Sequence, residues 1–145
     1  MRISTKGRYG LKAMNVLARA YGEGPMALRE IANQTGVPAP YLEQLFKKLR
    51  KAGLIHSERG ATGGYRLSRE PKDITAGAVI RALEGSIAPV ECADEGIGEC
   101  EIAAMCVENL LYTRIRQSVD AVVDAHTLAD LLTEQQKLNQ AEMQA

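Results

Sequence analysis

The region spanning residues 28–68 restricts the fold more than any other part of the chain. Residues 28–35 have the apolar spacing of a short helix that stops at Gly36. A turn over 37–40 separates it from another helix, expected over 41–52, which we call the recognition helix. The apolar face of the recognition helix consists of Leu42, Leu45, Phe46 and Leu49. Two short helices joined by a tight turn are typical of a helix-turn-helix.

A β-hairpin is predicted directly after the recognition helix. Residues 54–59 and 64–68 have the pattern of short strands, and the glycine-containing segment 60–63 lies between them. A hairpin in this position makes the unit a winged helix-turn-helix.

Further helices are expected on both sides of this unit. Apolar spacing predicts helices over about 5–21 and 75–83, the second of them capped by Asp73. A long helix is expected over about 101–124, and a capping-box pattern at Thr127 starts a short final helix.

These elements divide the chain into four parts. They are a winged helix-turn-helix DNA-binding domain over 1–72, a connecting helix and cysteine-bearing loop over 73–103, a dimerisation helix and short C-terminal helix over 104–138, and a frayed polar tail over 139–145. The predicted fold class is therefore mainly α, with a small β-hairpin wing and a long C-terminal dimerisation helix.

The apolar stripe of the long helix has two interpretations. It either covers the winged-helix core of its own chain or packs against a second copy. Helix-turn-helix proteins commonly read palindromic operators as two-fold dimers, which favours a homodimer.

Charge is distributed very unevenly along the chain. Residues 1–72 hold 14 Lys and Arg against 5 Asp and Glu, whereas residues 73–145 hold 4 against 13. The resulting net charges of +9 and −9 cancel in the formal total of zero. A basic half of this kind indicates binding of a polyanion, here double-stranded operator DNA.

Several side chains of the recognition helix are candidates for contact with DNA. Its first two turns usually face the major groove, where Glu43 would accept a hydrogen bond from cytosine and Gln44 would pair with adenine. Tyr41 either reaches a phosphate or sugar of the DNA or packs in the core against the hairpin. Lys47 and Lys48 would contact phosphates, which gives affinity rather than sequence choice.

The hairpin offers a second contact. Arg59 precedes Gly60 in the segment between the strands. Glycine lets the backbone approach another surface closely, and an arginine beside it suits insertion into a narrow minor groove.

The cysteines of the chain are confined to fifteen residues of its acidic half, at Cys92, Cys100 and Cys106. Neighbouring carboxylates disfavour a thiolate, so the setting does not suit a reactive nucleophile. A bound cationic centre would instead hold the thiols deprotonated. The sequence therefore predicts a metal site. Close cysteine pairs of the kind that structural zinc prefers are absent, and soft sulfur ligands also suit iron–sulfur clusters.

In combination, these segments resemble the IscR family of bacterial iron–sulfur cluster regulators, whose relatives include the nitric-oxide sensor NsrR. The resemblance is carried by residues 1–9, 41–46, 49–51 and 59–65, followed by the three cysteines. It covers about residues 1–135.

The resemblance implies a homodimeric transcription factor, usually a repressor, that senses iron–sulfur status and controls genes of cluster biogenesis. Cys92, Cys100 and Cys106 would hold a [2Fe–2S] cluster, supplied by iron–sulfur cluster donor proteins. The family's base contacts map onto Glu43 and Arg59.

The chain departs from the family pattern around the cluster. The first gap between cysteines has seven residues and the second five, whereas IscR proteins have five in each. The fourth ligand of IscR, a histidine three residues after the last cysteine, corresponds to Asn109 here, and the ligating acid of NsrR-like members corresponds to Arg8. The fourth ligand is therefore open among Glu108, Asn109 and a non-protein group.

Two further functions remain open. The first is that of a nitric-oxide, redox or cysteine-metabolism regulator of the same family, and the second is that of a helical adaptor that binds a partner protein. An enzyme is not indicated, because no nucleophile–base grouping, phosphate loop or carboxylate pair is legible.

The length of 145 residues and an apolar content of 46 % suit one compact domain or two small units. No apolar run approaches the roughly 18–20 residues of a membrane span, and the N-terminus lacks the apolar region of a secretory signal. We therefore expect a cytoplasmic protein with reduced thiols and no membrane partner.

Overall fold

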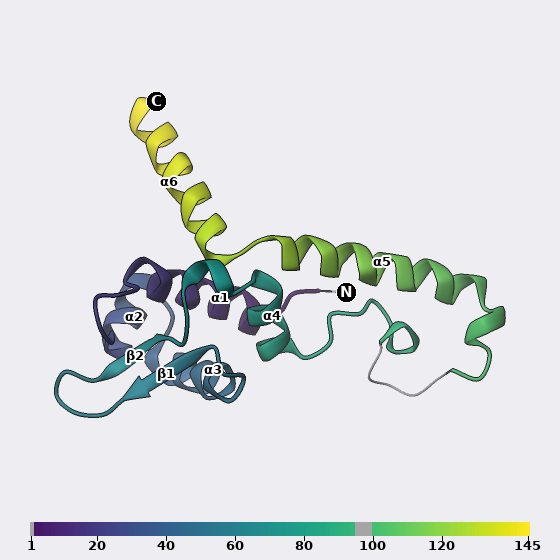
Figure 1. The fold of residues 1–145 in the computed structure, drawn as a ribbon, viewed down its shortest axis with the longest axis horizontal. Coiled ribbons are helices and arrows are strands. Elements are labelled where there is room, and N and C mark those ends of the chain that lie inside the picture. The colour runs from purple at the N-terminus through teal and green to yellow at the C-terminus, as the bar shows by residue number, and fades with distance from the viewer. Residues whose placement is uncertain (1, 95–99) are drawn as a thin grey trace.

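A computed structural model of the chain describes residues 2–94 and 100–145. Figure 1 shows α1 to α4 and two strands gathered in one body, with α5 projecting from it as an arm and α6 leaving in another direction. We call residues 5–84 the winged-helix unit. The helices and strands are α1 (Thr5–Arg19), α2 (Leu28–Thr35), α3 (Ala39–Lys51), β1 (Ile55–Glu58), β2 (Gly64–Leu67), α4 (Ala76–Glu84), α5 (Val107–Ala125) and α6 (Leu128–Gln144), and the short 3₁₀ turns are η1 (Pro71–Asp73), η2 (Glu91–Ala93) and η3 (Ala103–Met105).

The predicted winged helix-turn-helix is confirmed. β1 and β2 pair in antiparallel fashion, with Ile55 opposite Leu67. Met26 adds an isolated bridge to this wing, because its N–H donates to the Tyr65 carbonyl at 2.9 Å and its carbonyl accepts from the Tyr65 N–H at 2.8 Å. A side chain at Gly64 would collide with the Met26 carbonyl, so this close approach requires glycine.

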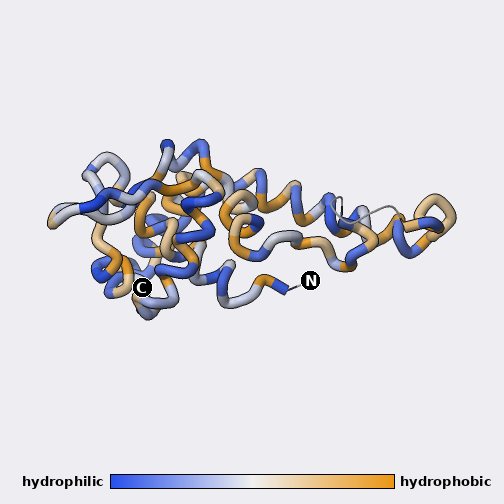
Figure 2. The backbone as a smooth tube through the Cα atoms, turned by 90° about the horizontal axis from the view of Figure 1, so that it is seen from below, coloured by the Kyte–Doolittle hydropathy of each residue, from blue (hydrophilic) through white to orange (hydrophobic). Residues whose placement is uncertain are grey.

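The hydrophobic core lies between the helices of the winged-helix unit, and Figure 2 shows hydrophobic segments meeting there. All four apolar residues predicted on the recognition helix are buried. The core also includes residues beyond position 72, where we expected the DNA-binding domain to end. Its largest fully buried side chains are Phe46, Met14, Ile31, Leu42, Leu49, Ile55, Ile74, Leu128 and Val79.

Helices α1 and α4 pack closely across two glycines of α1. A Cβ at Gly10 would overlap the Leu83 side chain, and a Cβ at Gly7 would lie 2.6 Å from Oε1 of Glu84. Larger residues at these positions would push the helices apart. The glycines therefore fix how α4 sits on the winged-helix unit.

The Glu84 carboxylate caps the N-terminus of α1 from the end of α4. Its Oε1 accepts hydrogen bonds from the Ser4 N–H at 2.8 Å, the Ser4 hydroxyl at 2.6 Å and the Gly7 N–H at 2.9 Å. These N–H groups belong to the first turn, where helical partners are lacking and a negative charge is favoured. Partial burial opposes ionisation, but the hydrogen bonds from Ser4 and Gly7 outweigh it and lower the pKa of Glu84.

Two helix starts differ from those expected. α3 begins at Ala39 rather than Tyr41, because Pro40 occupies the first turn, where its missing N–H is not needed and its fixed φ suits a helix. Thr75, not Asp73, caps α4, since its hydroxyl accepts the Ala78 N–H at 3.0 Å.

The C-terminal helices also differ in extent. α5 begins at Val107, not near residue 101, because Cys106 caps it. The expected capping box at Thr127 is present, with Asp130 at the third helical position. α6 then continues to Gln144 and includes most of the 139–145 tail that we expected to fray. In the described part of the chain, no helix combines the length and apolarity that crossing a membrane requires.

Apolar side chains lie on two faces of α5 rather than in one stripe. Val119 and Val123 are partly covered and line a cavity that Ile80 of α4 also lines. The opposite face exposes Leu110, Leu111 and Val122, which are 53 %, 56 % and 60 % accessible. The two interpretations of the apolar stripe therefore apply to different faces of the same helix, and the outer face is open to a partner.

We predict that Glu84→Gln lowers the free energy of unfolding at pH 7 by about 1–2 kcal/mol, because it removes the charged acceptor at the start of α1. Since folding lowers the pKa of Glu84, its stabilisation is complete above the ordinary value of 4.5 and is lost as the pH falls through the folded-state value. The difference between wild type and variant should therefore narrow below about pH 4.5 in urea titrations.

Glu134→Gln is the matched control. Glu134 is an exposed glutamate of α6 that pairs only within its own helix in the contacts described, with Lys137 at 2.7 Å. Its loss should change the unfolding free energy by less than about 0.5 kcal/mol. Equal losses in the two variants would contradict the cap.

Candidate nucleic-acid interface and cysteine segment

The amphipathic pattern of α3 determines which side chains are available to DNA. Burial of Leu42, Leu45, Phe46 and Leu49 turns the opposite face outward. Glu43, Gln44 and Lys47 are exposed on that outer face. The three residues are therefore presented together, as a helix that enters a major groove requires.

Tyr41 and Lys48 have partners within the chain. The Tyr41 ring is half-buried and meets Tyr9 of α1 edge-on, with centroids 5.9 Å apart. The Lys48 ammonium donates to the Leu83 carbonyl at the end of α4 at 3.4 Å. Tyr41 thus packs against α1 rather than against the hairpin, and Lys48 connects α3 to α4.

The wing is held against the recognition helix by contacts on two sides. Phe46 of α3 meets Tyr65 of β2 edge-on, with centroids 4.8 Å apart. The Arg50 guanidinium donates to the Ser57 hydroxyl of β1 at 3.1 Å. The sequence pattern did not indicate this role of Arg50 in orienting the wing.

Arg59 and Gly60 lie exposed where β1 ends. Gly60 has a φ of +110°, in the region that favours glycine. The neighbouring cation Arg66 pairs with Glu58 at 2.8 Å across the hairpin. Arg59 is thus an exposed cation of the wing, next to the backbone turn that the sequence suggested.

The cysteine segment, residues 91–94 and 100–106, lies where the connection from α4 reaches the start of α5. Cys92 is exposed in η2, whereas Cys100 and Cys106 are partly covered. The Cys106 sulfur accepts the Asn109 N–H at 3.4 Å, and its S–H donates to the Glu108 carboxylate at 3.5 Å. Residues 95–99, part of the expected cysteine-bearing loop, lie outside the described residues.

Asn109 connects the two parts of the cysteine segment. Its side-chain Nδ2 donates to the Cys92 carbonyl at 2.8 Å, and its Oδ1 accepts from the Thr113 hydroxyl at 3.5 Å. The side chain proposed as a possible ligand therefore acts here as a tether. No local sequence pattern indicates this contact, because Cys92 and Asn109 lie 17 positions apart in the chain.

The donor chemistry and the arrangement of the thiols give different answers about a metal cluster. Three thiols are suitable ligands for iron–sulfur centres. Within the described residues, however, no three His, Cys, Asp or Glu side chains are grouped closely enough to hold a metal ion. The arrangement of Cys92, Cys100 and Cys106 seen here does not fit a cluster.

Comparison with protein families identifies the chain's relationship. The profile of the Rrf2 family, described as an iron-dependent transcriptional regulator, matches residues 3–134. The chain belongs to the Rrf2 family. It is thus a DNA-binding transcription regulator, and the predicted kinship with IscR and its relatives is confirmed.

Two curated Rrf2 regulators illustrate the relationship. The transcriptional regulator CymR of Bacillus subtilis is 51 % identical over 132 residues, which covers 90 % of this chain and 89 % of CymR. IscR of Aliivibrio salmonicida is 37 % identical over 134 residues, which covers 92 % of this chain and 79 % of IscR.

Solved Rrf2 structures have the same fold. The B. subtilis CymR structure, titled the global cysteine regulator, aligns with a TM-score of 0.76 and 49 % identity over 92 % of this chain and 98 % of that one. T. potens IscR aligns with a TM-score of 0.74 and 43 % identity over 92 % of this chain and 88 % of that one.

Proposed function

We propose that this Rrf2 regulator is a homodimeric repressor that acts in the cytoplasm and controls genes of cysteine metabolism. The observation that carries the cysteine assignment is the 51 % identity with B. subtilis CymR, against 37 % with A. salmonicida IscR. These identities favour the cysteine-metabolism alternative over the iron–sulfur sensing that the resemblance first implied.

The outer face of α3 and the wing would form the operator-binding surface. Glu43 and Gln44 would read base edges in the major groove, and Arg59 with Gly60 would enter the minor groove. Lys47 would contact a phosphate. Lys48, given its bond to the Leu83 carbonyl, would reach DNA only by leaving α4. Tyr41 would contribute through its packing on Tyr9 or by touching the backbone of the DNA.

The outer face of α5 supports a homodimer. None of the residues of α5, all of which the structure describes, is buried within the chain. Leu110, Leu111 and Val122 expose apolar surface along a helix that projects from the winged-helix unit (Figure 1). A two-fold dimer would cover this face and present two recognition helices to a palindromic operator.

A second candidate function is iron–sulfur sensing through a [2Fe–2S] cluster. It is favoured by the three thiols of the cysteine segment and by the IscR relatives. Cys92, Cys100 and Cys106 would hold the cluster, and Glu108 or a non-protein group would complete it, because Asn109 is engaged as a tether. The cluster would supply a redox- and oxygen-sensitive centre, and its formation would require the cysteine segment to rearrange.

Genomic footprinting and metal analysis separate the two functions. Genomic fragments protected by the purified protein should lie upstream of genes for cysteine synthesis or uptake. Protected fragments upstream of cluster-assembly genes, together with the visible bands of a [2Fe–2S] centre after anaerobic reconstitution, would establish the second candidate instead. Loss of those bands in Cys106→Ser would identify the ligand, and a nitric-oxide titration of the reconstituted protein would test the nitric-oxide alternative.

Glu43→Ala should relax operator discrimination more than it weakens binding. A carboxylate that faces the wrong base is left desolvated and unpaired, so Glu43 rejects sites as well as selecting them. We expect discrimination against single-base variants of the footprinted operator to fall about tenfold, with affinity for the operator itself changing less than about threefold.

Lys47→Ala provides the contrast in the same titrations. Loss of a phosphate contact should weaken all duplexes alike and reduce the slope of log affinity against log salt by about 1. Equal losses on all sites in Glu43→Ala would contradict base reading by Glu43.

Leu111→Glu should convert the dimer to a monomer at micromolar concentration, because it places a charge in the apolar outer face of α5. Size-exclusion chromatography with light scattering measures the change. Leu138→Glu, at an exposed leucine of α6 that is 63 % accessible, should leave the dimer intact. A wild-type protein that is monomeric under these conditions would refute the dimer itself.

A further inference from the structure

The junction between α5 and α6 is joined by backbone hydrogen bonds to the start of α4 and the residues just before it. The Ala76 N–H donates to the His126 carbonyl at 2.8 Å, and the Leu128 N–H donates to the Ile74 carbonyl at 2.9 Å. Ile74 and Leu128 are both fully buried. We call this connection the pivot, because it fixes one end of α5 but leaves the angle between α5 and α4 to other contacts.

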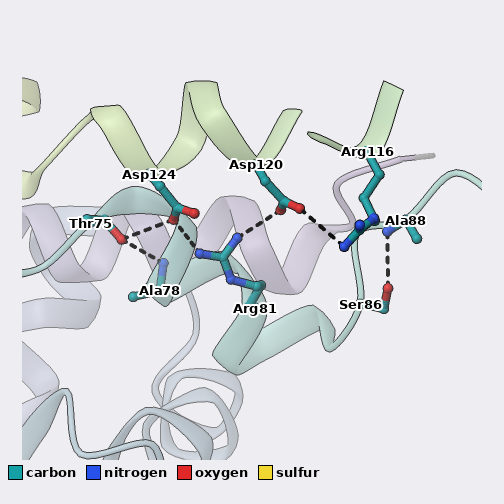
Figure 3. Close-up of polar contacts among 8 residues, drawn as sticks. All are labelled: Thr75, Ala78, Arg81, Ser86, Ala88, Arg116, Asp120 and Asp124. Carbon is teal, nitrogen blue, oxygen red and sulfur yellow. Dashed lines mark hydrogen bonds and ion pairs between the residues drawn. The ribbon is translucent and has the colours of Figure 1, made fainter. Parts of the chain in front are cut away.

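Arg81 of α4 makes the polar contacts that set this angle (Figure 3). Its Nη1 donates to Asp120 Oδ1 of α5 at 3.0 Å, and its Nη2 forms an ion pair with Asp124 Oδ1. The two aspartates lie one turn apart on the same face of α5. The planar guanidinium thus spans two carboxylates whose separation runs along α5, which a single point charge cannot do.

The same face of α4 approaches α5 closely at Gly77. A Cβ there would collide with the Asp124 carboxylate and would lie 2.9 Å from the Val123 side chain. The Thr75 hydroxyl also donates to Asp124 at 3.5 Å, and Arg116 lies 3.9 Å from the second oxygen of Asp120. Arg81 is therefore part of a continuous contact between α4 and α5 that begins at the pivot.

The other side of α4 is fixed to the DNA-reading helices. Glu84 caps α1, and Leu83 packs against Gly10 of α1 and accepts the Lys48 ammonium of α3 through its carbonyl. One turn of α4, residues 81–84, thus contacts α5, α3 and α1. A change of angle at Arg81 would move the whole winged-helix unit relative to α5.

We propose that Arg81 is a positioning residue that sets operator half-site spacing, by fixing the angle between α5 and the winged-helix unit through Asp120 and Asp124. This rests on the proposed function, a dimer joined through α5 that reads two half-sites. The 19 residues of α5 span about 28 Å. A rotation of about 10° moves the far end of such a helix by about 5 Å, more than the rise of about 3.4 Å per base pair.

Ion pairs with this much solvent access contribute little to folding stability. Arg81, Asp120 and Asp124 have side chains that are 38 %, 30 % and 44 % accessible. Removing the guanidinium should therefore leave the folded unit and each single half-site contact intact. Its effect should appear where two half-sites must be bound at once, because that is where the angle matters.

The test compares wild type, Arg81→Gln and the double variant Asp120→Asn/Asp124→Asn on duplexes of different half-site spacing. The wild-type protein first selects a duplex from a randomised library of about 30 base pairs. The probes are this duplex and versions of it with one or two base pairs added or removed between the half-sites. A duplex carrying a single half-site is included. The double variant removes the same contact from the α5 side and keeps the test decisive if Arg81→Gln does not fold.

Wild type should lose about tenfold in affinity when the spacing changes by one base pair, whereas both variants should lose less than about threefold. Binding to the single half-site should be unchanged. Lys137→Gln, which removes an ion pair within α6, should keep the wild-type spacing profile. Arg81→Lys should restore the profile only in part, since an ammonium cannot span both carboxylates.

An unchanged spacing profile in Arg81→Gln and in the double variant would overturn this role. A uniform loss on all duplexes, including the single half-site, would do the same, because it would indicate a structural defect. A wild-type protein that selects no two-half-site duplex would overturn the proposed dimeric function, and this role with it.

Discussion

The close contact between α1 and α4 is the constraint on which the rest of the structure depends. Gly7 and Gly10 let the two helices approach until Leu83 fills the space that side chains would occupy. The same approach brings the Glu84 carboxylate to the N–H groups of Ser4 and Gly7. Because α4 is fixed in this way, its remaining faces are available to orient α3 and α5. A short helix of nine residues thereby becomes the central connector of the chain.

This arrangement separates the proposed DNA-binding surface from the cysteine segment. Cys106 caps one end of α5 and His126 follows the other end, so about 28 Å of helix lies between them. Within one protomer, a change in the cysteine segment that acts along α5 would reach α3 through α4. The far end of the arm also contains hydrophobic backbone segments (Figure 2). Ile102 and Met105, which lie between or next to the cysteines in the sequence, are exposed. Sensing at this end would consequently act on the geometry of the dimer rather than on the base-reading side chains.

The sequence allowed the winged helix-turn-helix to be predicted because its signals are local. Each signal involves only a few neighbouring residues: the apolar spacing of Leu42 to Leu49, the helix stop at Gly36, and the glycines of the wing. The helix start at Ala39 was missed because the segment 37–40 was interpreted as a turn, although a proline in the first turn favours a helix. The start at Val107 was missed because cysteine is not a usual helix cap. The Glu84–Ser4 contact joins residues 80 positions apart, so no local sequence pattern predicts it. The two faces of α5 could be separated only once the position of α4 was known.

The candidate site divides in the same way between local and long-range information. Helical spacing alone places Glu43, Gln44 and Lys47 on one exposed face. The partners of Lys48 and Asn109, in contrast, come from distant segments of the chain.

The fold also does not reveal which signal the protein senses. A winged helix with its wing is compatible with many signals, because fold does not determine function. Under the proposed function, the cysteine segment would determine the specific signal. There, Asn109 stands where IscR has its ligating histidine; its side-chain amide donates to the Cys92 carbonyl, and its backbone N–H donates to the Cys106 sulfur. Because Asn109 lies in the first turn of α5, a rearrangement of the cysteine segment that breaks its bond to Cys92 would act directly on the start of that helix.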